Sequence, residues 1–362
     1  MLKPYAVENL LEGMQVGRDV LDADGGILLS AGTVLTQDMI GSLLERPIFS
    51  VYIDEAEQLV DIPGREHLLD EVYVAAYEGA YVRVKKLIES LAGERHWDEA
   101  MLQGLVSDIL RDLASDGAKA VSKIHNMERT GDYIYHHSLH VAILAALLGR
   151  WLGWSKEDRR ELVAAGLFHD VGKLRIDAAL LGKKGKLTEE EFATVRLHPA
   201  YGFEMMRQSA AEVHEGIKKG IMQHHERCDG SGYPEGLRRG EISPYGRLIA
   251  ILDIYDAMAA DRVYARRRSP FDIFKVLTED MTAGRLDPEY TVYFMRQVCR
   301  SLIGNWVLLS NGDRGRIVYI AESRVTALPM VQTVHDEFID LEQRKDIRVE
   351  ALLTAQEVTI SN

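Results

Sequence analysis

The chain has 362 residues, of which 46% are hydrophobic and 27% are charged, and its formal net charge at pH 7 is −13. This length is enough for about two or three domains with substantial cores, whereas the acidic balance excludes general binding to polymeric nucleic acid, which needs a basic face. Two cysteines exclude a disulfide framework, and without a signal-peptide core or an apolar run long enough to span a bilayer, we expect a soluble cytoplasmic protein that does not bind membranes.

Residues 1–62 are expected to form a small β-rich domain. The segment from Val16 to Leu21, the turn residues at 24–26 and the apolar run from Ile27 to Leu29 predict a hairpin, because glycine in the turn accepts a positive φ. The alternation of apolar and polar residues from Ile48 to Ile53 predicts a further strand.

Residues 63–125 are expected to form a helical connector, because apolar residues recur there at intervals of four and three. These residues are Tyr73, Tyr77, Ala80, Val84, Leu87 and Leu91. Such a narrow seam is either the buried face of an amphipathic helix packed on its own chain or the contact face of a coiled coil in a homodimer. Sustained heptads are missing, which favours packing within the chain.

Residues 126–300 are expected to form a helical domain, and residues 301–362 a small β-containing segment. In the second of these, the runs Trp306–Leu309 and Arg316–Ile320 flank an Asn-Gly turn and predict two paired strands. The fold class that follows is mainly α, with a small β-rich segment at the N-terminus and a short β-containing segment at the C-terminus.

The histidines are concentrated in the helical domain, where nine of the 12 lie between His125 and His225. Two adjacent pairs stand out, His169-Asp170 and His224-His225. Imidazole is the commonest metal ligand in proteins, and a carboxylate beside it can bridge to a second metal. Neighbouring residues on a helix diverge by about 100°, so each pair can contact two metals. The pattern predicts a multinuclear metal site.

Further ligands can come from other helical segments. His198 precedes a proline, which displaces it toward a helix junction. Asp253 lies in an aliphatic segment, where a carboxylate needs a cation or a hydrogen-bond donor, and Asp256 can orient a ligand from one turn further on. His137 opens another apolar stretch, but two neighbours on the same helix could take its place. These alternatives are His136 and His140.

The motifs resemble, in order, those of the HD-GYP family, a branch of the His-Asp metal phosphohydrolases, over roughly Asp132 to Asp287. They are His137-Ser138, His169-Asp170-Val171-Gly172-Lys173, His198-Pro199, His224-His225-Glu226, Asp229-Gly230-Ser231-Gly232-Tyr233-Pro234, Asp253-Ile254-Tyr255-Asp256-Ala257 and Asp261-Arg262-Val263-Tyr264. The family has a helical catalytic domain that holds two or three iron or manganese ions. Asp170 is then the bridging residue of a ligand set that comprises His137, His169, Asp170, His198, His224, His225 and Asp253.

The resemblance implies a phosphodiesterase that hydrolyses the bacterial second messenger cyclic di-GMP to pGpG, with GMP as the product of a further hydrolysis. Two divalent ions can bind the phosphate oxygens and lower the pKa of a bridging water from about 16 toward neutrality, so that hydroxide attacks phosphorus. Asp170 and Lys173 would serve catalysis, with Lys173 placed to contact a phosphate or the leaving group. Tyr233 would stack on a guanine, Gly232 would allow close approach of the loop, and Arg262 would contact a guanine or a phosphate.

Two positions depart from the family pattern. Some members carry a glutamate four residues before the first histidine ligand, where this chain has Tyr133. We therefore expect two divalent ions, iron or manganese, rather than three. Active members often have a basic residue three positions after the arginine, where this chain has Ala265.

Tyr233 also has a purely structural interpretation, since Gly-Tyr-Pro can be a rigid turn whose ring packs inward.

Two other functions fit the same residues. The chain could be a non-catalytic receptor that binds a cyclic dinucleotide and signals through its flanking segments. A receptor needs no complete dinuclear centre, and the intact ligand set argues against it. The chain could also hydrolyse another cyclic dinucleotide, such as cyclic GMP-AMP, because the motifs do not separate the two bases.

Overall fold

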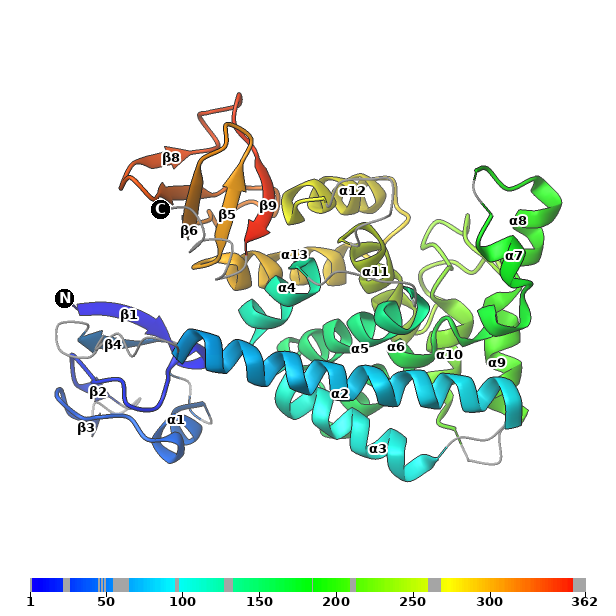
Figure 1. Ribbon diagram of the computed structural model, residues 1–362, viewed down its shortest axis with the longest axis horizontal. Coiled ribbons are helices and arrows are strands. Elements are labelled where there is room, and N and C mark those ends of the chain that lie inside the picture. Colours follow the sequence, from blue (N-terminus) through cyan, green and yellow to red (C-terminus); the bar gives the residue numbers. More distant parts are fainter. Residues whose placement is uncertain are drawn as a thin grey trace. The chain divides into compact units, whose positions relative to one another are not determined.

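The structure is a computed structural model, and it describes residues 2–21, 27–44, 46, 48, 50–54, 65–94, 98–126, 133–183, 185–208, 213–259 and 268–353. The chain divides into two compact units, Met1–Asp70 and Glu71–Asn362 (Figure 1). The division falls within helix α2 (Arg65–Glu94). The boundaries expected near residues 62, 125 and 300 remain predictions.

The first unit is built from two small antiparallel sheets. β1 (Leu2–Ala6) pairs with β4 (Ser50–Asp54), and β2 (Val20–Leu21) pairs with β3 (Ile27–Leu29). Helix α1 (Gln37–Leu44) and the 3₁₀ turn η1 (Val7–Asn9) accompany the sheets. The predicted hairpin is confirmed, although its turn at residues 22–26 lies outside the described residues, and so is the strand that leads to Ile53. The core of this unit includes Val16, Leu35 and Val51.

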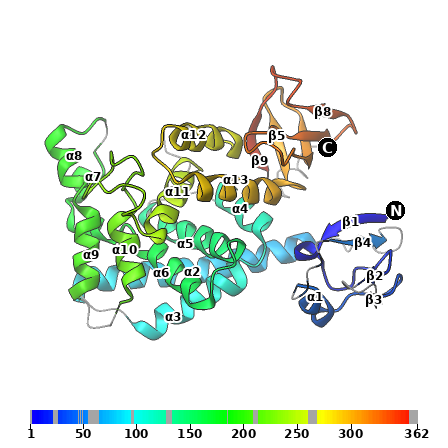
Figure 2. The same ribbon diagram turned by 180° about the vertical axis from the view of Figure 1, so that it is seen from behind.

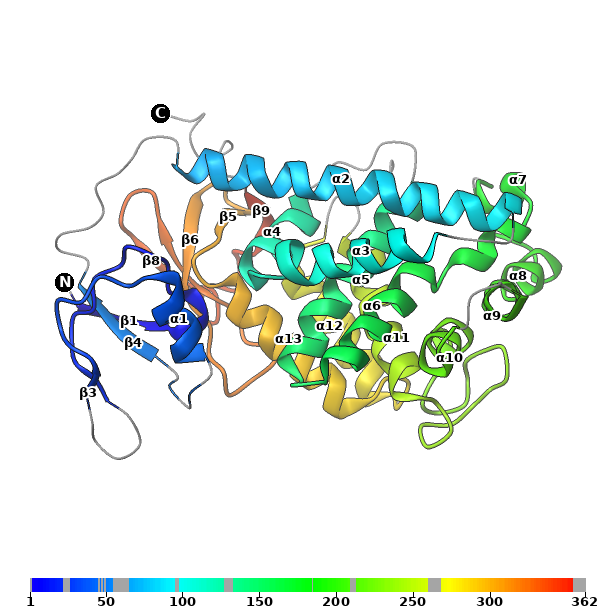
Figure 3. The same cartoon turned by 90° about the horizontal axis from the view of Figure 1, so that it is seen from below.

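The second unit begins with the long helix α2, followed by α3 (Glu99–Asp108), a π-helical turn (Ile109–Leu113) and α4 (Gly117–Asn126). Figure 3 shows α2 along one side of the helical bundle. Every residue of the predicted apolar seam of α2 is buried and belongs to the main core of this unit. The seam therefore packs within the chain, as the first of its two interpretations predicted.

The helical bundle continues with the helices from α5 to α13. Their bounds are α5 (Tyr133–Trp151), α6 (Lys156–Phe168), η3 (Val171–Arg175), α7 (Ala178–Leu181), α8 (Glu189–Val195), α9 (His198–Gln208), α10 (Glu215–Gln223), α11 (Pro244–Ala259), α12 (Pro270–Thr282) and α13 (Pro288–Leu302). α5 is buried on all sides from His136 to Gly149, because residues 141–148 are all apolar and the three histidines before them have buried hydrogen-bond partners. α6 and α11 pack directly against it, and Figure 2 shows α5 and α6 inside the bundle.

The C-terminal strands form one antiparallel sheet in the order β8-β7-β6-β5-β9. Their bounds are β5 (Trp306–Leu309), β6 (Arg314–Tyr319), β7 (Met330–Thr333), β8 (Phe338–Asp340) and β9 (Val349–Leu353). The two predicted strands are confirmed as β5 and β6, and the sequence reading missed the other three. The inward residues of this sheet, among them Val307 and Ile317, share one core with the helices.

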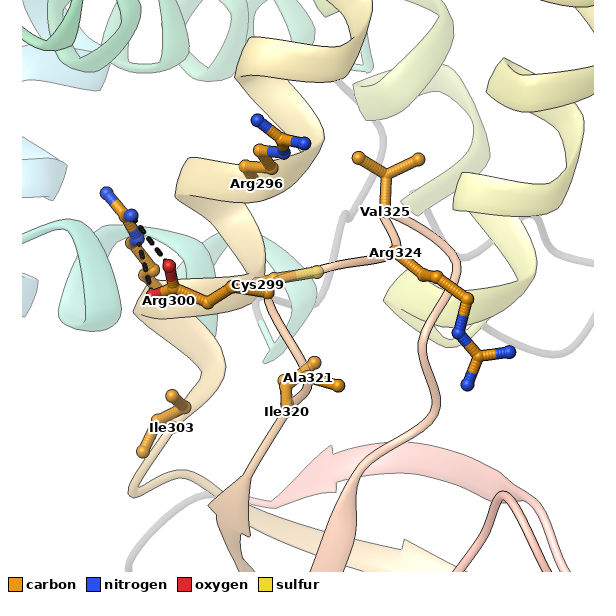
Figure 4. A pocket seen from close by; sticks show the side chains of 9 residues that line it. Arg296, Cys299, Arg300, Ile303, Ile320, Ala321, Arg324 and Val325 are labelled. Carbon is orange, nitrogen blue, oxygen red and sulfur yellow. Dashed lines mark hydrogen bonds and ion pairs between the residues drawn. The ribbon is translucent and has the colours of Figure 1, made fainter.

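A pocket lies between α13 and the segment that follows β6 (Figure 4). Cys299 and Ile320 contribute to its wall, and Arg300 forms an ion pair with Glu322 at 3.0 Å beside it. None of the predicted site residues lines this pocket. Within the described part of the chain, each helix is too short or too polar to cross a lipid bilayer.

Candidate metal centre

Side chains suited to metal binding gather in two adjacent groups inside the helical bundle. The first group consists of His137, His169 and Asp253, and the second of Asp170, His198, His224 and His225. Within each group, the potential ligand atoms all lie within 4.8 Å of one another. The structure thus brings together every side chain that was predicted as a metal ligand. Their role as ligands remains a prediction.

Helix ends supply most of these side chains. α6 ends at Phe168 and α10 ends at Gln223, so each adjacent pair lies just beyond the last turn of a helix. Gly172, which follows the first pair, touches the start of α9: a Cβ on it would lie 1.9 Å from the carbonyl oxygen of His198. Only glycine permits this approach, which places His198 beside Asp170.

Asp170 lies between the two groups. Its Oδ2 atom is 3.5 Å from Nε2 of His169 and 3.7 Å from Nε2 of His137. Its Oδ1 atom is 3.2 Å from Nε2 of His198 and 3.8 Å from Nε2 of His224. The two oxygens of one buried carboxylate therefore face different groups, which is the arrangement that a bridging ligand requires.

Asp253 has a similar position on α11. Its Oδ1 atom is 3.0 Å from Nε2 of His137, and its Oδ2 atom is 4.0 Å from Nδ1 of His225. A second carboxylate thus faces both groups. Two negative charges among imidazoles in a buried site need cations to offset the loss of hydration.

Hydrogen bonds fix the tautomers of four histidines. In three of them, Nδ1–H donates to the main-chain carbonyl three residues earlier, at 2.8, 2.8 and 2.7 Å. These three are His169, His198 and His224. In His137, Nδ1–H donates to Oδ2 of Asp256 at 2.7 Å. With the proton on Nδ1, each ring presents the lone pair of Nε2 to the centre, as metal-bound histidines do.

The Nε2 atoms of these four histidines lie close together in two pairs. Those of His137 and His169 are 3.1 Å apart, as are those of His198 and His224. At His198 and His224 two lone pairs face each other, and at this distance they repel unless a cation lies beside them. At His137 a proton on Nε2 fills that place in the absence of metal. Oδ1 of Asp170 is also buried, and within the described part of the chain it accepts no hydrogen bond. Imidazole nitrogens and carboxylate oxygens in this arrangement fit the binding of divalent metal ions.

The protonation states favour the same conclusion. His137 is the exception: burial disfavours its imidazolium form, but hydrogen bonds to Asp253 and Asp256 raise its pKa to about 9, so a metal ion would have to displace its Nε2 proton. Burial lowers the pKa of His225 to about 3 and that of His224 well below its ordinary value. Burial opposes the ionisation of Asp253, yet the hydrogen bond with His137 holds the pKa of the carboxyl below its usual range. The carboxylates are thus charged and His224 and His225 neutral, the forms that bind metals.

Lys173 lies next to the candidate bridging residue. Its Nζ atom is 2.5 Å from Oδ2 of Asp170, and a quarter of its side chain is exposed. Burial alone would lower the pKa of Lys173, but the charge of Asp170 raises it, so the side chain is an ammonium. A cation at the edge of the centre is available to an anionic ligand.

Tyr233 is half-buried beside the second group. Its ring stacks on His225 with the centroids 4.6 Å apart and an interplanar angle of 26°, and the guanidinium of Arg196 lies 4.7 Å from the ring centroid. Arg196 was not predicted as a site residue. A Cβ on Gly232 would lie 2.3 Å from the main-chain nitrogen of Arg227. Gly232 thus allows close packing of the loop on its own backbone.

Two residues of the predicted substrate side cannot be placed. Arg262 and Ala265 lie outside the described residues. Tyr133, at the position of the additional carboxylate in some family members, stacks its ring on His137 with the centroids 5.4 Å apart and an interplanar angle of 9°.

Glu226 is a buried residue beside the candidate ligands that the sequence analysis did not single out, although it belongs to a matching motif. It is 2% exposed, and its carboxylate accepts hydrogen bonds from the main-chain nitrogens of Glu235 and Leu237 at 2.7 and 2.9 Å. It thereby holds the loop that carries Tyr233 against the end of α10. The sequence signal available for it was a glutamate directly after two adjacent histidines.

Comparisons with known proteins agree with this geometry. The model of the HD domain family matches residues 106–290. Cyclic di-GMP phosphodiesterase PA4108 of Pseudomonas aeruginosa is 30% identical over 259 residues, which cover 71% of this chain and 61% of that protein. 3'3'-cGAMP-specific phosphodiesterase 3 of Vibrio cholerae is 38% identical over 157 residues, which cover 43% of this chain and 34% of that protein. The chain thus spans less than two thirds of the length of these relatives.

Among solved structures, Bd1817, an HDG"Y"P protein from Bdellovibrio bacteriovorus, is similar with a TM-score of 0.52. The match covers 81% of this chain and 98% of that chain at 18% sequence identity. At this identity, the likeness concerns the fold alone.

Proposed function

This chain belongs to the HD domain family, and we propose that it is a phosphodiesterase that hydrolyses cyclic di-GMP to pGpG with two divalent ions, iron or manganese. The observation that carries the proposal is the position of Asp170, whose two oxygens face two separate groups of buried ligands. A site for a single metal would need only one such group. A homodimer is not part of the proposal, because the seam that suggested it is buried within the chain.

The two groups would each hold one ion. His137, His169 and Asp253 would bind the first, and Asp170 would be shared with the second group, which consists of His198, His224 and His225. Bound there, two divalent ions neutralise the phosphate oxygens and lower the pKa of a water to make a nucleophile available near pH 7.

Other side chains would act on the substrate directly. Lys173 is an ammonium beside Asp170, where it would bind a phosphate oxygen or the leaving oxygen. Tyr233 offers an aromatic ring for a guanine, and Arg196 adds a guanidinium next to that ring. Arg262 would contact a guanine or a phosphate, by its place in the family motif.

Cyclic di-GMP is preferred as substrate because the relative that covers the largest part of this chain among those named above is a cyclic di-GMP phosphodiesterase. Other relatives are 3'3'-cGAMP-specific phosphodiesterases, which makes cyclic GMP-AMP the second candidate. Both molecules are anionic cyclic dinucleotides, and the same metal centre would serve either. The two molecules differ in their bases, so contacts with the bases would determine which of them is the substrate.

The test is a turnover assay on the full chain purified without oxygen, after its metal content has been measured. Cyclic di-GMP and 3'3'-cGAMP are offered separately, and Asp170→Asn serves as the inactive control. We expect pGpG from cyclic di-GMP, and a loss of several orders of magnitude in Asp170→Asn, because a neutral amide bridges metals poorly. Binding of the dinucleotide without hydrolysis would indicate a receptor instead, and hydrolysis of 3'3'-cGAMP alone would correct the substrate.

A further inference from the structure

A series of buried hydrogen bonds leads from the candidate ligand His137 to helix α2. Nδ1 of His137 is 2.7 Å from Oδ2 of Asp256, and Oδ1 of Asp256 is 2.9 Å from Nδ1 of His140. Nε2 of His140 is 2.7 Å from the hydroxyl of Tyr77. All four residues are at most 1% exposed. The series passes from α5 to α11, back to α5 and then to α2.

The direction of each hydrogen bond follows from the chemistry of Asp256. A carboxylate only accepts, so the Nδ1 atoms of His137 and His140 must both donate to it. His140 then has a lone pair on Nε2, to which the hydroxyl of Tyr77 donates. The oxygen of Tyr77 is left to accept from Nδ1 of His136, which lies 2.9 Å away. Every donor in the network meets an acceptor.

The network also explains the extra histidines of α5. His136 and His140 were alternatives to His137 in the sequence, yet neither belongs to the two groups of potential ligands in the described chain. His140 and His137 both contact the carboxylate of Asp256. The position of that carboxylate therefore affects the orientation of both rings. Partners of this kind orient a metal-bound histidine and fix its tautomer.

We propose that Tyr77 is a positioning residue for the metal centre and acts on it through His140 and Asp256. The proposal rests on the proposed role of His137 as a metal ligand. Asp256 fixes the tautomer of His140, and the hydroxyl of Tyr77 holds the His140 ring in place through Nε2. His140 in turn holds Asp256 in the orientation that aims Nε2 of His137 at the metal. Without the hydroxyl, Nε2 of His140 loses the hydrogen bond from Tyr77 in a buried site, where the loss of such a bond is costly. The relay begins on α2, the helix in which the two units of the chain join.

The test compares Tyr77→Phe with Tyr73→Phe in the full chain. Tyr73 is a matched control because it also lies on α2, is 5% exposed, and donates its hydroxyl to the carbonyl oxygen of Leu113 at 3.2 Å, outside the relay. Mn²⁺ affinity is measured by titration with electron paramagnetic resonance, and the histidine ¹⁵N spectrum is recorded on metal-free protein. The kcat and KM for cyclic di-GMP are measured alongside.

We expect Tyr77→Phe to weaken Mn²⁺ binding roughly 3- to 10-fold, as the loss of one buried hydrogen bond implies. It should also shift the ¹⁵N signals of His140, and lower kcat while KM stays the same, since Tyr77 touches no substrate group. Tyr73→Phe should leave Mn²⁺ affinity and the His140 signals unchanged, even if it lowers the melting temperature equally.

Equal Mn²⁺ affinity in Tyr77→Phe and the unaltered chain would overturn the proposal. So would an equal loss of affinity in both variants, because that loss would come from a general loosening of α2. Failure of the unaltered chain to bind Mn²⁺ would have a different meaning: it would contradict the proposed metal centre itself, and the role of Tyr77 with it.

Discussion

The Nε2 atoms of His198 and His224 lie 3.1 Å apart although both rings donate from Nδ1 to main-chain carbonyls. Their lone pairs therefore face each other between two buried rings, and this repulsion opposes folding. A divalent ion bound by both nitrogens would turn the repulsion into two favourable bonds. The stability of the helical bundle should consequently depend on metal.

Removal of metal by a chelator should lower the free energy of unfolding of the chain. Binding to the native state alone adds about 2.7 kcal/mol when the free ligand is at 100 times its Kd. Thermal unfolding with EDTA, and again after addition of Mn²⁺, measures the effect. Mg²⁺ at the same concentration is the control for ionic strength. A melting temperature that does not change with Mn²⁺ would contradict the metal centre.

The metal-free protein should lose stability as the pH falls from about 6.5, the ordinary pKa of histidine, toward 3. Burial lowers the pKa of His225 to about 3 and also lowers that of His224, so in this window the unfolded chain binds protons that the native chain does not. His137 acts in the opposite sense: its pKa is raised to about 9, and the stability it adds below pH 6.5 is lost as the pH rises through 9.

Melting temperatures of chelated protein across this pH range measure the effect. His225→Gln should flatten the acid side of the curve, whereas the same change at His335, which is exposed and remote in the sequence, should leave it unaltered. If the melting temperature of His225→Gln still falls with pH as steeply as that of the unaltered chain, groups other than His225 cause the loss of stability.

The chain should hold two metal ions, not three. A third would need a carboxylate at position 133, where the ring of Tyr133 stacks on His137. Elemental analysis of anaerobically purified protein gives the number of ions per chain. Tyr133→Phe keeps the ring and should keep the same metal content, while three ions in the unaltered chain would show that another residue supplies the missing ligand.

Much of the fold was predictable from the sequence because its patterns are local. The apolar seam of α2, the hairpin of β2 and β3, and the strands β5 and β6 follow from periodicity and turn residues. Strands β7, β8 and β9 were missed, since no Asn-Gly or similar turn pair marks the segments between them. The resemblance to the HD-GYP family is confirmed by the match of the HD domain and by the relatives.

The site was predictable only as a set of residues. Adjacent pairs such as His169-Asp170 indicate metal binding by themselves, but the sequence could not indicate that Asp170 places one oxygen toward each group. Nor could it pair His140 with Asp256, which lie 116 positions apart, or bring Arg196 over Tyr233. These contacts depend on the packing of helices that are distant in the chain.

Tyr233→Ala should impair the hydrolysis of cyclic di-GMP more than that of a small phosphodiester without a base. Loss of a stacking surface costs about 1–3 kcal/mol, or roughly 5- to 150-fold in kcat/KM. Tyr233→Phe keeps the ring and should remain close to normal, and neither change should alter metal content. Arg262→Ala should likewise weaken the handling of cyclic di-GMP at constant metal content.

The contacts of Tyr233 make the comparison of two substrates decisive. Its ring already stacks on His225, a candidate metal ligand, and Arg196 lies beside it. If Tyr233→Ala slows bis(p-nitrophenyl) phosphate and cyclic di-GMP by the same factor, the ring serves to support His225, and the role in base recognition must be abandoned. If only cyclic di-GMP is affected, the ring binds guanine, because a substrate without a purine cannot detect the loss of a stacking surface.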